Sequence, residues 1–180
     1  MKILVTGGAG FIASHIVDAY VQLGHDVLVI DNLTSGDKSN LNPKANFAQM
    51  DITDPKLHIA IENFKPDLIN HHAAQINLRA SVEDPQFDAR VNILGTIQLL
   101  EAAKKAGSVS KVIFASTGGA IYGDTKNLPT PETEPAWPMS PYGIAKLSAE
   151  HYLYYYQQVH SIPYTVLRYG NVYGPRQNPH

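Results

Sequence analysis

The first thirteen residues hold the feature that most restricts the fold of this chain. Ile3, Leu4 and Val5 form a short apolar run typical of a buried strand, and the glycine-rich segment 7–10 follows it directly. An apolar helical pattern then begins at Phe11. A strand, a tight glycine turn and a helix start in this order predict a site for phosphate groups, because the free N–H groups of a helix N-terminus attract anions.

Three small residues of this turn have separate predicted roles. Gly7 allows the sharp turn, Gly10 lets the backbone approach a pyrophosphate, and Ala13 lets the helix pack closely on the strand. A glycine pattern alone is weak evidence, because any helix entry after a buried strand can contain one. Its place at the head of an alternating pattern of strands and helices favours a dinucleotide site.

That alternating pattern predicts the fold. Further strands are expected at 27–30, 46–50, 66–70, 111–115 and 163–168, and helices at 11–23, 55–64, 85–106 and 142–159. Strands alternating with helices indicate an α/β fold with a doubly wound parallel sheet. The proline-rich segment 124–141 predicts an irregular loop. A length of 180 residues is enough for one domain with a real core.

Composition excludes several classes of partner. The net charge is −2 and no basic block occurs, so neither nucleic acid nor a membrane surface is an expected partner. Cysteine is absent, which suits a cytoplasmic protein and leaves no disulfide framework. No apolar run is long enough to span a bilayer, and no signal peptide is expected because Met1 leads straight into the first strand.

Acidic residues follow the second and third predicted strands. Asp31 stands 18 residues after Ala13, near the spacing of an acid that hydrogen-bonds an adenosine ribose. Such a carboxylate repels a 2′-phosphate, so it predicts NAD rather than NADP. The alternative is an acid that only caps the junction of strand and loop. Asp51 and Ile52 follow the third strand and are placed to touch an adenine ring.

Two adjacent histidines, His71 and His72, follow the fourth strand. Neighbours on an extended chain point to opposite sides, and no third ligand stands at a suitable spacing, so no metal site is predicted. Ala73 and Ala74 are expected to form the floor under the cofactor. Asn92, a polar residue in an apolar helix, is expected to satisfy a backbone group of a neighbouring loop.

Tyr142 and Lys146 are four residues apart and therefore share one face of the last predicted helix. An ammonium beside a phenol favours the phenolate, so the pKa of Tyr142 is expected to be lowered and Tyr142 to act as a general base. Ser116 and Thr117 end the fifth strand at the same sheet edge. Either hydroxyl could bind the reacting oxygen, and the alternative is a hydroxyl that only caps the strand.

Together these motifs resemble the extended short-chain dehydrogenases/reductases, and within them the nucleotide-sugar epimerases of the UDP-glucose 4-epimerase type. The motifs are Thr6–Ala13, Asp31–Leu33, Asp51–Ile52, Ser116–Thr117, Ser140–Lys146 and Leu167–Pro175. The resemblance covers essentially the whole chain and implies a Rossmann fold that binds NAD. It is more specific for the superfamily than for the substrate.

The resemblance also implies residue roles. Tyr142 is then the general base and acid, Lys146 tunes it and holds the nicotinamide ribose, and Thr117 or Ser116 binds the reacting hydroxyl. The residues expected to contact NAD are Gly7, Gly10, Phe11, Ile12, Asp31, Asn32, Asp51, Ile52, Ala73, Ala74, Asn92, Tyr142, Lys146 and Tyr169. The implied reaction oxidises C4 of a nucleotide sugar by hydride transfer to NAD, turns the 4-keto intermediate, and returns hydride to its other face.

Several alternatives stay open. Sibling dehydratases and decarboxylases need an acid where Gly118 and Gly119 stand, and Asp31 disfavours an NADP-linked reductase. A non-catalytic NAD sensor or scaffold would use the fold for binding only. Members of the family carry a further C-terminal region that binds the nucleotide of the sugar. Residues 1–180 are expected to form the NAD-binding domain without that region, and so to bind NAD but turn over nucleotide sugars poorly or not at all.

Surplus apolar residues on two predicted helices suggest an oligomer. The helices at 85–106 and 142–159 carry more apolar side chains than packing on one sheet requires, including the aromatic run Tyr152–Tyr156. The resemblance implies that these two helices pair across a two-fold axis. The chain is therefore expected to form a homodimer.

Overall fold

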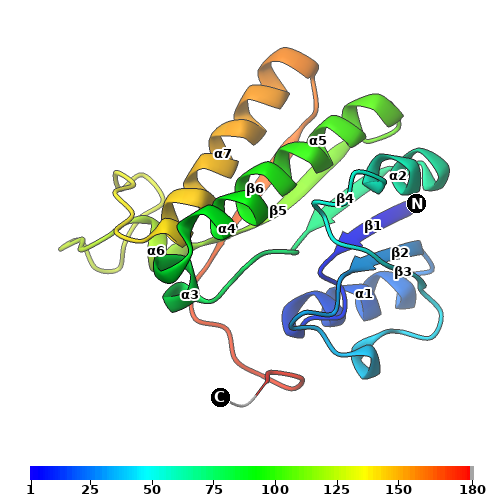
Figure 1. Cartoon of the computed structure of the whole chain (residues 1–180), viewed down its shortest axis with the longest axis horizontal. Coiled ribbons are helices and arrows are strands. Elements are labelled where there is room, and N and C mark those ends of the chain that lie inside the picture. The colour runs from blue at the N-terminus through cyan, green and yellow to red at the C-terminus, as the bar shows by residue number, and fades with distance from the viewer. Residues whose placement is uncertain (179–180) are drawn as a thin grey trace.

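A parallel six-stranded sheet with the order β3-β2-β1-β4-β5-β6 is the centre of the molecule (Figure 1). A computed structural model describes residues 1–178, so the last two residues, where the chain stops, lie outside the described part. The strands are β1 (Lys2–Thr6), β2 (Asp26–Asp31), β3 (Asn46–Gln49), β4 (Leu68–His71), β5 (Lys111–Thr117) and β6 (Tyr164–Tyr169). Every neighbouring pair is parallel, which confirms the predicted doubly wound sheet. The order reverses between β1 and β4, where open sheets of this kind bind ligands at the carboxyl ends of the strands.

The longer helices agree with the sequence predictions. They are α1 (Phe11–Gln22), α2 (Leu57–Phe64), α5 (Gly95–Ala106) and α7 (Pro141–His160). The expected helix over 85–106 is present as α4 (Pro85–Ala89), a π-helical segment η2 (Arg90–Leu94) and α5, which follow one another without a break. Shorter elements are α3 (Leu78–Glu83), α6 (Gly118–Ile121) and a 3₁₀ turn η1 (Lys38–Asn40).

The sheet is buried on both faces by two separate apolar clusters. Ile3 and Val5 of β1 point to one face, where they pack with Val17 of α1. Leu4 points to the other face, where it joins the larger cluster built with α2, α5 and α7. Because successive strand residues alternate between faces, a strand covered on both sides reads as a continuous apolar run. That explains why β1 was predictable from sequence.

One helix starts later than predicted, and one helix was not predicted. The helix expected from Pro55 begins at Leu57. The carboxylate of Asp54 accepts from the N–H of Lys56 (2.7 Å), so residues 54–56 form a turn before the helix. Helix α3 was not expected from the sequence. Its capping residue Asn77 accepts from the N–H of Ala80 (3.0 Å), which is the ordinary role of asparagine at a helix N-terminus.

The chain after β6 returns to α1 (Figure 1). His15 Nε2 donates to the carbonyl of Pro175 (3.0 Å), and Arg176 pairs with Asp18 (2.7 Å). These contacts fix the segment after β6 beside the first turns of the helix that follows the glycine turn. Among residues 1–178, no helix is both long and apolar enough to cross a membrane.

Candidate functional site

The glycine turn joins the carboxyl ends of β1 and β4. Gly7 has a φ of +73°, a conformation that favours glycine, and its N–H donates to the carbonyl of Ile30 (2.8 Å). A Cβ at Gly7 would lie 2.7 Å from the backbone nitrogen of Ala73, so the turn and the segment after β4 are in direct backbone contact. The expected role of Gly7 as the tight turn agrees with this geometry.

The start of α1 is open for an anion. Gly10 is the N-cap and has no side chain to occupy the free N–H groups of the first turn, which contains no acidic residue. Phe11 and Ile12 begin the helix, and the half-buried position of both leaves the turn at the surface. Free backbone donors and the positive end of the helix dipole can hold a phosphate group here. The cradle therefore fits the pyrophosphate of a dinucleotide.

Asp31 fixes the turn from the side of β2. Its Oδ2 accepts from the N–H of Ala9 (3.0 Å), and its Oδ1 accepts from the N–H of Leu33 (2.8 Å). The side chain is 7% exposed, so its two oxygens lie at the edge of the cradle with lone pairs to spare. The capping role that the sequence left open is real, and it is compatible with ribose binding by the remaining lone pairs.

Asn32 and Asp51 are brought together by β2 and β3. Asn32 Nδ2 donates to Asp51 Oδ2 (2.6 Å), and the N–H of Thr53 donates to Asp51 Oδ1 (2.8 Å). Burial raises the pKa of Asp51, but the hydrogen bonds from Thr53 and Asn32 outweigh it and leave this pKa lowered. Ile52 beside them is buried. These residues form one wall beside the ends of the two strands.

Asn92 holds the segment after β4, as the sequence predicted. Its Oδ1 accepts from the N–H of Gln75 (3.0 Å), and its Nδ2 donates to the carbonyl of Gln75 (2.9 Å). Asn92 lies in the π-helical segment η2, and such segments are frequent at functional sites. Ala73 and Ala74 are therefore fixed between the glycine turn and Asn92.

The two histidines point in different directions. His71 is buried and contacts the hydroxyls of Thr6 (2.7 Å) and Thr96 (3.1 Å), whereas His72 Nε2 lies 3.1 Å from the hydroxyl of Tyr169. Within the part of the chain that the structure describes, no three His, Asp or Glu side chains are grouped so that they could hold a metal ion.

Lys146 is buried beneath Tyr142. Ser140 caps α7 by accepting from the N–H of Gly143 (3.1 Å), and Lys146 lies on the second turn. Its Nζ donates to the carbonyl of Ala115 (3.0 Å) and is 6.0 Å from the centroid of the Tyr142 ring. Burial lowers the pKa of Lys146 to about 8, although nearby carboxylates oppose that shift.

The predicted lowering of the Tyr142 pKa was wrong for the chain alone. Burial raises the pKa of Tyr142, and the negative charge of Asp88 raises it further. The reason is geometric: Lys146 Nζ donates to Ala115 at the end of β5, whereas the phenol is desolvated and faces an acid. Tyr142 would need an additional positive charge beside it to become a base near neutral pH.

Ser116 and Thr117 have different environments because they alternate along β5. Ser116 is 5% exposed, and its hydroxyl donates to Glu150 Oε1. Glu150 in turn accepts from Arg168 Nη2 (2.7 Å), so the serine belongs to a partly buried ion-pair network. Thr117 Oγ1 accepts from the N–H of Ala120 (3.2 Å) as the cap of α6, and its O–H remains available as a donor.

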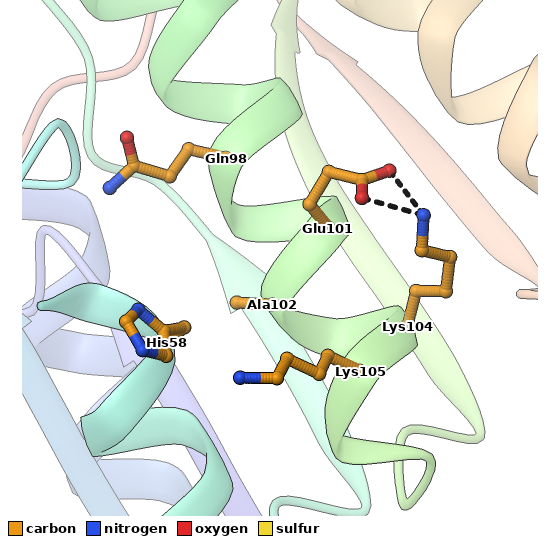
Figure 2. Close-up of a pocket in the computed structure, with 6 residues that line it drawn as sticks. All are labelled: His58, Gln98, Glu101, Ala102, Lys104 and Lys105. Atoms are coloured by element: carbon orange, nitrogen blue, oxygen red, sulfur yellow. Dashed lines mark hydrogen bonds and ion pairs between the residues drawn. The ribbon is translucent and has the colours of Figure 1, made fainter. Parts of the chain in front are cut away.

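A hollow elsewhere on the surface lacks these groups. It lies between α2 and α5, and Figure 2 shows its lining residues His58, Gln98, Glu101, Ala102, Lys104 and Lys105. Lys104 is already paired with Glu101 (2.6 Å). None of the predicted catalytic or cofactor residues lines this hollow. The candidate site is therefore the carboxyl edge of the sheet, where the glycine turn, Asp31, Asn92 and Tyr142 are found.

Known proteins are similar to this chain in sequence. The putative UDP-glucose 4-epimerase of Methanocaldococcus jannaschii is 51% identical over 98% of this chain and 58% of its own length. The UDP-glucose 4-epimerase of Mycolicibacterium smegmatis is 45% identical over the whole of this chain and 59% of its own length. The chain thus spans about three-fifths of the length of these curated relatives.

Solved structures are similar to this chain in fold as well as in sequence. A UDP-glucose 4-epimerase from Thermotoga maritima, determined with UDP-glucose, is 51% identical and matches with a TM-score of 0.98 over 100% of this chain and 59% of its own. A Thermus thermophilus UDP-glucose 4-epimerase in complex with NAD is 47% identical and matches with a TM-score of 0.96 over 100% of this chain and 58% of its own. The sequence pattern of one family matches residues 3–180. This chain belongs to the NAD dependent epimerase/dehydratase family.

Proposed function

We propose that this chain is the NAD-binding part of a nucleotide-sugar 4-epimerase of the UDP-glucose type. The observation that carries the proposal is the placement of Tyr142 above a buried Lys146 at the sheet edge that also holds the glycine turn. The relatives named above support the substrate class, because UDP-glucose was present in the structure of one of them. About two-fifths of their length has no counterpart in this chain, so the activity of the whole protein is part of the proposal.

Both ends of the cofactor site have assigned residues in this proposal. Gly7, Gly10, Phe11 and Ile12 hold the pyrophosphate, and Asp31 accepts from the adenosine ribose. The remaining contacts are assigned to Asn32, Asp51, Ile52, Ala73, Ala74, Asn92, Tyr142, Lys146 and Tyr169. Asp31 would repel a 2′-phosphate, so NAD should bind more tightly than NADP. Tighter binding of NADPH than NADH in a fluorescence titration would contradict this assignment.

Three side chains have roles at the reacting carbon. Tyr142 Oη takes the proton of the sugar C4 hydroxyl and returns it, and Lys146 holds the nicotinamide ribose. Thr117 is the better candidate for binding the reacting hydroxyl, because its O–H is free whereas that of Ser116 is committed to Glu150. When bound, NAD supplies a positively charged ring that accepts hydride from C4 and returns it. That charge would oppose the effect of burial and of Asp88 on Tyr142.

The test is a Tyr142→Phe variant, with Tyr154→Phe on the exposed side of the same helix as the matched control. Tyr142→Phe should keep NAD binding and reduce hydride transfer from UDP-galactose to bound NAD by about 10²-fold or more. Tyr154→Phe should resemble the parent in both. NADH absorbance in a single turnover measures the transfer. Equal rates in the parent and Tyr142→Phe would overturn the proposed role.

The second candidate function is a non-catalytic NAD sensor or scaffold. It rests on the fold alone, which can bind a dinucleotide without catalysing a reaction. A sensor would bind NAD and be indifferent to Tyr142→Phe, with no hydride transfer in any variant. A third reading, a dehydratase, is disfavoured because Gly118 and Gly119 follow Thr117 and provide no acid there.

We also infer a homodimer formed by the helices at 85–106 and 142–159. Seven large apolar side chains are exposed on these helices, among them Phe87 (43%), Leu94 (58%), Tyr152 (39%) and Tyr155 (45%). An exposed apolar patch of this kind marks protein–protein contacts. Light scattering at micromolar concentration should give twice the monomer mass, and Leu94→Glu should give the monomer. A Leu23→Glu control on α1 should leave the mass unchanged, and a monomeric parent would refute the inference.

A further inference from the structure

A buried carboxylate beside the catalytic pair has no assigned role. Asp88 of α4 is 0% exposed, and its Oδ1 accepts from Gln75 Nε2 (2.9 Å) and from Asn92 Nδ2 (3.0 Å). Its Oδ2 is buried, and no hydrogen-bond partner for it exists among residues 1–178. A buried carboxylate oxygen without a donor is unfavourable, and most buried polar atoms in proteins are satisfied. Packing alone does not explain an acid at this position.

The two donors of Asp88 are Gln75, in the segment after β4, and Asn92, in the π-helical segment η2. Asn92 already binds both backbone groups of Gln75, and Asp88 joins the two side chains through one oxygen. The donors come from different elements, the segment after β4 and the π-helical segment η2. Asp88 therefore holds Gln75 and Asn92 in one arrangement, and this arrangement adjoins α7, whose first turn carries Tyr142.

Asp88 also dominates the negative charge at the Tyr142–Lys146 pair. On α7, Glu150 faces Lys146 but is already paired with Arg168 (2.7 Å). His71 ends β4 and half-buried His72 follows it, and both feel the charge of Lys146. Desolvation lowers the pKa of His71 well below its ordinary value and that of His72 to about 4, so both imidazoles are neutral. Within the described chain, Asp88 is the remaining acid that acts on both Tyr142 and Lys146.

We propose that Asp88 is a positioning residue of this site, which fixes Gln75 and Asn92 in one arrangement and holds a negative charge near the Tyr142–Lys146 pair. The proposal rests on the proposed function where it treats Tyr142 as the reacting base. The charge has a definite effect: it favours the protonated form of both the phenol and the ammonium. The pH below which Tyr142 is protonated and the pH above which Lys146 loses its proton are then both higher than they would be without the charge of Asp88.

Two substitutions separate the two parts of the role. Asp88→Asn keeps the shape and an Oδ1 that can accept from both amides, and it removes the charge. Asp88→Ala removes the charge and the acceptor. The matched control is Asp84→Asn, which removes a charge from the exposed N-cap of the same helix, where asparagine caps as well as aspartate.

The readout is the ionisation of Tyr142 in the full chain without substrate. Tyrosinate absorbance is titrated in each protein and in its Tyr142→Phe derivative, and the difference between the two curves belongs to Tyr142. Asp88→Asn and Asp88→Ala should move the midpoint of this difference to lower pH, and Asp84→Asn should leave it in place. Asp88→Ala should also weaken NAD binding about tenfold, because the amides of buried Asn92 and half-buried Gln75 lose their shared acceptor. Asp88→Asn should retain most of that affinity.

An unchanged midpoint in Asp88→Asn, or an equal shift in Asp84→Asn, would overturn the charge role. Full NAD affinity in Asp88→Ala would overturn the positioning role. Both readouts are independent of turnover, so equal hydride-transfer rates in the parent and Tyr142→Phe would defeat the proposed role of Tyr142 and leave the test of Asp88 intact. Where the chain is active, the pH profile of hydride transfer in Asp88→Asn should move to lower pH on both limbs.

Discussion

Gly7→Ala should destabilise the fold and weaken NAD binding together, because Gly7 is constrained twice. An alanine in the left-handed conformation that Gly7 adopts costs about 1–2 kcal/mol. Its Cβ would also lie 2.7 Å from the nitrogen of Ala73 and 2.9 Å from the carbonyl carbon of His72. Both atoms are backbone, and the N–H groups of these two residues donate to Thr6 Oγ1 (3.2 Å each), so they cannot move aside easily. Relief of that clash should add about 1–3 kcal/mol, as overpacking does in cores.

Gly24→Ala is the matched control, because it separates the two terms. Gly24 has nearly the same φ (+78°), and nothing lies within 4 Å of a Cβ built on it. The Gly24→Ala variant should lose only the about 1–2 kcal/mol of unfolding free energy that the left-handed backbone costs an alanine, and it should keep its affinity for NAD. Urea unfolding gives the free energy of unfolding of both variants, and a fluorescence titration gives NAD affinity. Equal losses of stability, with NAD binding unchanged in Gly7→Ala, would refute the reasoning.

Two further predictions concern buried charge. His71 and His72 have pKa values below the ordinary value of 6.5, so the unfolded chain takes up protons that the folded chain refuses. The free energy of unfolding should therefore fall as the pH drops below about 6.5, by up to about 1.4 kcal/mol per pH unit for each histidine. Urea unfolding of the parent and of His72→Gln at pH 7 and pH 5 measures how much of the loss each histidine causes. Glu150→Gln should lower the free energy of unfolding by about 2–3 kcal/mol, because it leaves Arg168 without its partly buried partner. The exposed pair broken by Lys105→Gln should cost less than about 1 kcal/mol, and equal losses in the two variants would show that burial of the Arg168 pair is unimportant.

The fold was predictable because its strongest signals are local. The strands are short apolar runs, and α7 starts at Pro141 after the capping Ser140, as the sequence indicates. Helix α3 escaped prediction because six residues are too few to establish a helical period, although its cap Asn77 is visible in the sequence. The tetrapeptide of α6 begins with two glycines, which have low helix propensity, so only the cap from Thr117 and the surrounding structure make it helical.

The site was predictable in its residues more than in its electrostatics. The four-residue spacing of Tyr142 and Lys146 places both on one face of α7, and the sequence shows that directly. The sequence does not show that Lys146 Nζ binds the carbonyl of Ala115, or that Asp88 faces the phenol, because both partners are far away along the chain. The expected sign of the Tyr142 pKa shift failed for that reason. Strand alternation could have separated Ser116 from Thr117, but only the fold shows that Glu150 takes the serine hydroxyl.

The buried His71 shows how hydrogen-bond directions connect the two ends of the site. Thr6 Oγ1 accepts from two backbone N–H groups, so its one proton must be donated to Nδ1 of His71. Thr96 Oγ1 donates to the carbonyl of Asn92 (2.8 Å), so it must accept from Nε2 of the same ring. The imidazole is therefore neutral and protonated on Nε2, in agreement with its strongly lowered pKa. Protonating Nδ1 would set two protons against each other at Thr6, directly before Gly7. The residue that joins the glycine turn to the helix of Asn92 is thus held in one tautomer, which fixes the spacing between the glycine turn and the segment that carries Asn92.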